Sequence, residues 1–182
     1  MLVAKSLKNK NIAEYLLYMW QVEDLMRAER FEIENIYSKV IDRYDQPENV
    51  KQEIKVWYEN LIDMMRIEGI MEKGHLAINN NVILGLTDLH NRLLKSPKEA
   101  EYTATYYKTL PFIVELRSKN KVKETAELET CFSALYGMLL MRLQGRDISG
   151  ETQAAISQIS NLLRMLAAKY NDDQAGVLDI ED

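Results

Sequence analysis

Three charged side chains interrupt helix faces that are otherwise apolar, and they are the first candidates for a polar site. Glu23 points into the apolar arc of a helix near the N-terminus, Glu68 continues the stripe of a later helix, and Arg142 lies within a third stripe. A buried charge without a partner is strongly unfavourable. Each residue therefore has one of three settings: the rim of a helix face, an internal ion pair or hydrogen-bond network, or a ligand or catalytic site.

The internal ion pair takes a specific form here, because Glu23 and Arg142 carry opposite charges and both interrupt apolar stripes. We hypothesise that the two side chains form a buried salt bridge. On this hypothesis Glu23→Gln lowers the free energy of unfolding by a few kcal/mol, since the substitution leaves a buried arginine without its counter-charge.

A second candidate chemistry is metal binding. Glu72 and His75 have the Glu-x-x-His spacing that di-iron carboxylate bundles use, in which both side chains project from one helix face. Such sites need two of these motifs, and the other histidine, His90, has no glutamate three residues before it. Gly74 also weakens a helix where the geometry matters. We therefore expect a helix terminus with an exposed histidine, and Glu72 and His75 remain only candidate metal ligands.

Other catalytic and cofactor-binding signatures are absent from the sequence. Two histidines, neither beside a nucleophile-bearing turn, do not suggest a Ser-His-Asp set, and no glycine-rich phosphate-binding motif occurs, so we expect no cofactor. Cys131, the single cysteine, lies among apolar residues and is predicted to be a buried thiol. Tyr102 and Tyr106 either stack on a base or a peptide or form a core stripe with hydroxyls at its edge, which their four-residue spacing favours.

The elements that must position these residues are helices. Few glycines and prolines, and apolar stripes that recur at helical spacing, predict an all-α bundle with mostly antiparallel neighbours. Ser96 and Pro97 form the clearest helix start, and Pro111 predicts a kink or a break near Tyr107 to Leu110. We expect seven helices, over residues 11–29, 31–45, 47–73, 80–95, 97–119, 124–145 and 150–171.

The charge of the chain is concentrated at its C-terminal end. Residues 172–182 contain five acidic residues and no basic residue, which equals the formal net charge of −5. We expect residues 1–171 to form a single helical domain and residues 172–182 to be a disordered acidic tail. Because the body is formally neutral, nucleic-acid binding is disfavoured. No secretory signal and no membrane-spanning run is present in the sequence, so we expect a cytoplasmic protein without a membrane partner.

The segment Asn-Ile-Ala-Glu-Tyr-Leu-Leu-Tyr-Met-Trp-Gln-Val-Glu-Asp-Leu-Met-Arg-Ala, residues 11–28, resembles the opening of a known family. This is an uncharacterised all-helical family of Bacteroidetes proteins of similar length, described as a domain of unknown function. The similarity extends over most of the chain. It implies a bacterial source and a cytoplasmic all-α protein, and it supplies no catalytic residues.

The expected function is therefore that of a non-enzymatic helical interaction or scaffold protein that self-associates, with a homodimer or another protein as partner. Methionine, tryptophan and tyrosine side chains on helices adapt well to partner surfaces. The alternative is an enzyme or a small-ligand binder, with a polar pocket between helices near Glu23, Glu68 and residues 102–107. A nucleic-acid-associated regulator is the third alternative, disfavoured by the lack of a basic helix.

Overall fold

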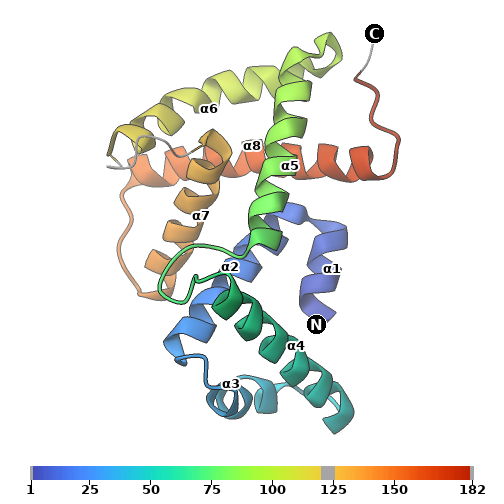
Figure 1. Ribbon diagram of the computed structural model, residues 1–182. Coiled ribbons are helices and arrows are strands. Elements are labelled where there is room, and N and C mark those ends of the chain that lie inside the picture. Colours follow the sequence, from blue (N-terminus) through green and yellow to red (C-terminus); the bar gives the residue numbers. More distant parts are fainter. Residues whose placement is uncertain (1, 120–125, 181–182) are drawn as a thin grey trace. The chain divides into compact units, whose positions relative to one another are not determined.

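The computed structural model describes residues 2–119 and 126–180, and over these residues the chain is all-α with no strand, as the sequence predicts (Figure 1). Two 3-10 helices, η1 and η2, accompany the eight α-helices of this part of the chain. The helices are α1 (Leu2–Lys10), α2 (Ile12–Ala28), α3 (Ile33–Lys39), η1 (Ile41–Arg43), α4 (Glu48–Ile67), α5 (Ala77–Lys95), η2 (Pro97–Glu99), α6 (Ala100–Lys119), α7 (Glu127–Leu143) and α8 (Gly150–Gln174).

The structure differs from the expected helices mainly at their ends. α1 precedes the first predicted helix, and the predicted helix over residues 47–73 ends at Ile67. Gly69 causes this early end, because its φ of +70° is a left-handed conformation that glycine adopts without steric cost. The following Ile70 amide donates to the carbonyl of Met65, which closes the last turn. The predicted helix start at residue 124 and the last two residues of the predicted acidic tail lie outside the described residues.

Pro111 does not break its helix. α6 continues through it, and the predicted interruption takes the form of a curve along the helix (Figure 1). The side chain of Pro111 is exposed, so its ring crowds the preceding turn on the side away from the core. Ser96 and Pro97 start a helix as predicted: the Ser96 hydroxyl accepts a hydrogen bond from the Lys98 amide, and η2 leads directly into α6.

The chain divides into two compact units, Met1–Asn9 with Glu14–Asn81, and Lys10–Ala13 with Val82–Asp182. In the first unit α4 packs against α3 and η1. In the second unit α6, α7 and α8 pack against one another around a core that includes Tyr102, Phe132 and Leu163. The single domain expected over residues 1–171 stays a prediction.

The C-terminal end of the second unit carries two ion pairs. α8 extends to Gln174, three residues beyond its predicted end, and Asp173 pairs with Arg92 at 2.9 Å. Asp179 lies 2.7 Å from the ammonium group of Lys98. The disorder expected for residues 172–182 stays a prediction. Over residues 2–119 and 126–180, no helix is both long enough and apolar enough to span a lipid bilayer.

Two glycines offer a direct test of the helix end at Gly69. An added Cβ meets no atom within 4 Å at Gly69 or at Gly85, which lies inside α5 with an ordinary φ. Gly69→Ala should lower the free energy of unfolding by about 1 kcal/mol, because alanine disfavours positive φ. Gly85→Ala should raise it by about 0.5–1 kcal/mol, because alanine favours the helix. Urea unfolding of both variants measures the two effects, and shifts of the same sign would contradict the assigned turn.

Candidate functional site

Glu23 on α2 is completely buried, and three groups of the first unit form hydrogen bonds to its carboxylate. Its Oε1 atom accepts hydrogen bonds from the Leu76 amide at 3.0 Å and from Asn79 Nδ2 at 2.7 Å. Its Oε2 atom lies 2.6 Å from His75 Nδ1. We call Glu23, His75, Leu76 and Asn79 the Glu23 network. The buried carboxylate is therefore stabilised by neighbouring donors in the first unit.

His75 also stacks on an aromatic ring of α2. The ring centroids of His75 and Trp20 are 4.0 Å apart, with an angle of 9° between the ring planes. The His75 carbonyl accepts a hydrogen bond from Asn80 Nδ2 at 2.9 Å. The imidazole is thus held on one face by the indole and at Nδ1 by Glu23, and its side chain is only 27% exposed.

Arg27, one turn after Glu23, attaches the same segment of the chain at further points. Its Nη2 atom donates to the carbonyls of Ile70 and Gly74, and its Nη1 atom bonds to Asp24 at 2.9 Å. α2 therefore fixes the connection between α4 and α5 by side chains spaced at helical intervals.

Glu68, at the end of α4, contacts the start of α5. Its carboxylate accepts a hydrogen bond from the Ala77 amide at 2.7 Å, which satisfies an otherwise free donor in the first turn of α5.

The three predicted site residues, Glu23, Glu68 and Arg142, do not form one site in the structure. Glu23 belongs to an internal network, which was one of its three expected settings. The hypothesis of a buried Glu23–Arg142 salt bridge is wrong, because Arg142 is exposed in the last turn of α7. Glu68 is also exposed. Its carboxylate caps α5.

The exposed histidine expected at position 75 is wrong, because the His75 side chain is only 27% exposed and bonds to Glu23. Residues 72–75 are not helical, so Glu72 and His75 also do not project from one helix face, as the metal-ligand alternative requires. In the described part of the chain, no group of three or more histidine, cysteine or acidic side chains is arranged to hold a metal ion. Gly74, which has a φ of +95°, keeps this segment out of a helix.

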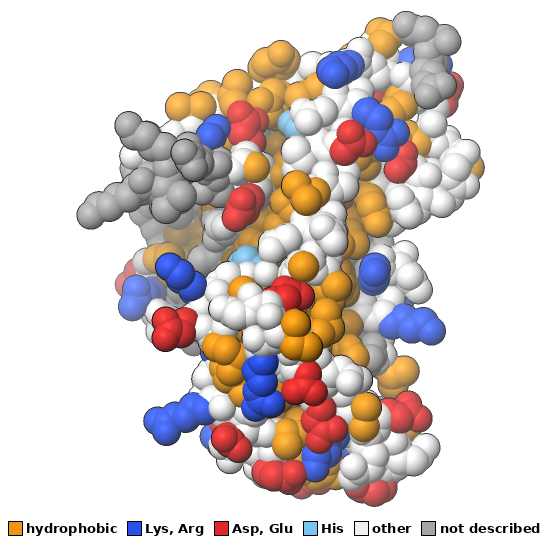
Figure 2. Space-filling model, in the orientation of Figure 1, with side chains coloured by type: hydrophobic (Ala, Val, Ile, Leu, Met, Phe, Trp, Pro, Cys, Tyr) orange, Lys and Arg blue, Asp and Glu red, His pale blue; other side chains and the backbone are white. Residues whose placement is uncertain are grey.

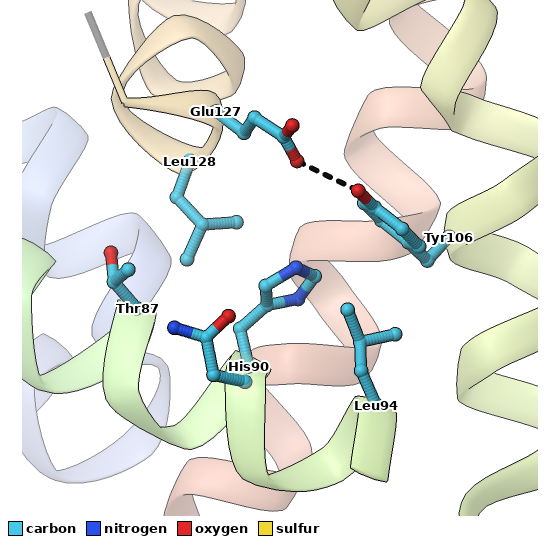
Figure 3. Close-up of a pocket in the computed structure, with 7 residues that line it drawn as sticks. Thr87, His90, Leu94, Tyr106, Glu127 and Leu128 are labelled. Carbon is cyan, nitrogen blue, oxygen red and sulfur yellow. Dashed lines mark hydrogen bonds between the residues drawn. The ribbon is translucent and has the colours of Figure 1, made fainter.

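A separate cavity of about 290 Å³ lies in the second unit (Figure 3). Polar and apolar side chains of α5, α6 and α7 line it: Thr87, His90, Asn91, Leu94, Tyr106, Glu127 and Leu128. The imidazole of His90 extends between Leu128 and Tyr106 (Figure 3). We call this space the His90 cavity. Among the residues that line this cavity, the sequence predicted only Tyr106 as part of a possible pocket. His90 was not predicted, because no residue at a recognisable spacing suggests a partner for it.

His90 is only 4% exposed, and its Nδ1 atom lies 2.6 Å from the Tyr102 hydroxyl. Burial lowers the pKa of His90, while the nearby Glu127 carboxylate opposes this shift. Burial also raises the pKa of Tyr102, so its hydroxyl keeps its proton. We assign the Tyr102 hydroxyl as the donor to Nδ1, because it makes no other hydrogen bond among the described residues, and this assignment places the proton of a neutral imidazole at Nε2.

Tyr106 and Glu127 form a second polar pair at the cavity. The Tyr106 hydroxyl donates to Glu127 Oε2 at 2.9 Å, as Figure 3 shows. Burial and then this hydrogen bond raise the pKa of Tyr106 to about 12. The other carboxylate oxygen of Glu127 lies 3.8 Å from Arg117 Nη1, which is longer than a hydrogen bond. The neighbouring Cys131 thiol is buried as predicted, and burial raises its pKa to about 12.

α6 also carries an exposed apolar stripe on the side away from its core. Its members recur at intervals of three and four residues, so they lie along one side of the helix. Tyr107 is 64% exposed and Val114 is 56% exposed. We call this stripe the α6 face: Ala100, Ala104, Tyr107, Pro111 and Val114, all exposed. Figure 2 shows hydrophobic side chains gathered along α6.

Glu23→Gln tests the Glu23 network. An amide nitrogen in place of one carboxylate oxygen faces a donor, and the charge that strengthens three hydrogen bonds is lost. The substitution should lower the free energy of unfolding by about 2–4 kcal/mol, measured by urea unfolding. Glu68→Gln is the matched control, because this exposed side chain keeps an acceptor for Ala77 and should change stability by less than about 1 kcal/mol. Equal effects of the two substitutions would rule out the network as a stabilising element.

The protonation state of His90 is a second measurable property. Long-range ¹H–¹⁵N NMR spectra should show a neutral ring with its proton at Nε2, and a pKa below the ordinary value of about 6.5. Since the unfolded chain then binds more protons than the folded chain, His90 makes stability fall as the pH drops below about 6.5. An imidazole of His90 that becomes protonated above this pH would contradict the assignment.

Comparison with known proteins identifies a protein family. A protein-family model described as a domain of unknown function (DUF4924) matches residues 1–177. No curated protein and no solved structure matches the chain.

Proposed function

We propose that this chain, which belongs to the DUF4924 family, is a non-enzymatic helical interaction protein that self-associates through the α6 face. The observation that carries the proposal is the continuous exposed apolar stripe of α6. Contiguous exposed apolar surface commonly marks sites of protein–protein interaction. On the resemblance of residues 11–28, we also propose a bacterial source among the Bacteroidetes and a cytoplasmic setting.

The residue types of the α6 face suit helix-to-helix packing. Ala100 and Ala104 are small, which lets a second helix approach closely, while Tyr107 provides a large ring of the kind that is enriched at interfaces. Pro111 lies at the centre of the stripe on the exposed side. A partner that covers this side would remove the exposed area of Tyr107 and Val114 from water, which is favourable.

Charges beside the stripe support a second copy of the chain as the partner. Lys108 and Glu115 are exposed, and they lie on the same border of the α6 face on opposite sides of Pro111. A two-fold axis near Pro111 pairs two α6 helices in antiparallel orientation. Lys108 of one copy then lies beside Glu115 of the other, so the surface is complementary to itself in charge.

A charge introduced into the α6 face tests the proposal. We expect the wild-type chain to elute as a dimer in size-exclusion chromatography with light scattering, with twice the mass of the 21.2 kDa chain. Val114→Glu should shift it to the monomer, because an unpaired carboxylate would be buried at the interface. Val56→Glu is the matched control: Val56 is 52% exposed on α4, and its substitution should leave the dimer intact.

Two outcomes would overturn the proposal. One is a wild-type chain that is monomeric at every concentration tested. The other is a dimer that persists in Val114→Glu and in Tyr107→Glu while both variants keep the helical circular dichroism of the wild type.

A further inference from the structure

The His90 cavity contains a hydrogen-bond donor that the protein itself does not satisfy. His90 Nδ1 is occupied by the Tyr102 hydroxyl, and no other hydrogen bond of that hydroxyl occurs among the described residues. The Nε2 proton of His90 has no acceptor among the described residues, and Nε2 is not one of the fully buried polar atoms that lack a partner, so it is open to the cavity although the side chain is only 4% exposed. A donor that reaches the cavity can bond to water or, in place of water, to an acceptor on a bound molecule.

Glu127 supplies the opposite chemistry from another wall of the cavity. Its Oε2 atom accepts from Tyr106, while among residues 2–119 and 126–180 its second oxygen makes only the 3.8 Å contact with Arg117. Both side chains of that pair are 35% exposed, so solvent weakens the attraction of Arg117. The carboxylate can therefore accept a hydrogen bond from a positively charged group, and such a bond is stronger than one from a neutral donor.

The remaining lining residues define the size and the surroundings of a molecule that could bind in the cavity. The rings of His90 and Tyr106 meet edge to face with centroids 5.0 Å apart, and aromatic rings attract cations. Leu94 and Leu128 provide apolar walls. The volume of about 290 Å³ lies near the lower limit of ligand pockets, which is roughly 300 Å³. A compact organic amine fits within this volume.

We propose that the His90 cavity binds a small primary ammonium compound that also carries a hydroxyl or carbonyl oxygen. The ammonium group bonds to Glu127 beside the Tyr106 ring, and the oxygen accepts the Nε2 proton of His90. The apolar part of the molecule lies against Leu94 and Leu128. No residue of the α6 face lines this cavity, so failure of the self-association test would leave this proposal standing.

Three matched probes test the chemistry on the full-length chain. The compound 2-amino-1-phenylethanol has the ammonium group, the hydroxyl and an apolar ring, while phenethylamine lacks the hydroxyl and 2-phenylethanol lacks the ammonium group. In ¹⁵N NMR titrations, 2-amino-1-phenylethanol should shift the His90 Nε2 signal saturably. Phenethylamine should bind more weakly without the same Nε2 shift, and 2-phenylethanol should bind at least about tenfold more weakly, as expected for the loss of one charged contact.

Substitutions at the start of α7 separate the site from a general effect of charge. Glu127→Gln keeps an acceptor for Tyr106 but removes the negative charge, so it should weaken binding of 2-amino-1-phenylethanol about tenfold. Glu129→Gln removes a carboxylate from the same first turn of α7, outside the cavity lining. This variant should bind 2-amino-1-phenylethanol with the affinity of the wild type.

Several results would overturn the proposal. These are the absence of a saturable His90 shift with 2-amino-1-phenylethanol, equal affinity for 2-phenylethanol, and unchanged affinity in Glu127→Gln. The first of them would mean that solvent alone satisfies the Nε2 proton. Because Glu127→Gln leaves the buried His90–Tyr102 pair intact, the test does not depend on a substitution in the core.

Discussion

The buried carboxylate of Glu23 is the constraint on which the first unit depends. A charge with no exposed surface requires donors around it, and the donors come from the connection before α5 and from its first turn. The position of this connection is therefore set by the hydrogen bonds that the Glu23 carboxylate requires. Trp20 and Arg27, one turn on either side of Glu23, hold the same connection by stacking and by hydrogen bonds to its carbonyl groups.

The second unit uses its polar residues differently. There α6 contributes to both proposed sites: Tyr106 lines the His90 cavity, while the adjacent Tyr107 is exposed on the α6 face. Cavity occupancy and self-association would thus share one helix. Any displacement of α6 caused by one event would alter the other, and such coupling is reciprocal between the two binding free energies.

Sequence reasoning could predict what depends on local patterns. Apolar periodicity indicated most of the helices, and the Ser96–Pro97 start was confirmed because caps act within a few residues. Glu23 could be identified as a misfit, since a charge within an apolar arc needs a partner. Two of its three partners could not be predicted, because one is a backbone amide and one is an amide side chain, and neither carries a charge. The third, His75, was considered only as a metal ligand or an exposed side chain. Arg142 was chosen because its charge also interrupts an apolar stripe, but that stripe ends at the exposed last turn of α7. The His90 cavity depends on three helices meeting, which no local spacing encodes.

The sequence separation within the Glu23 network has a consequence for the order of folding. The partners of Glu23 lie 52, 53 and 56 residues later in the chain. At typical synthesis rates of about 5–20 residues per second, roughly 3–11 s pass between the addition of Glu23 and that of Asn79. During this time α2 can form as an isolated helix with its carboxylate in water, but burial of that carboxylate must wait. Closure of the first unit is therefore a late, non-local event, whereas helix formation is early and local.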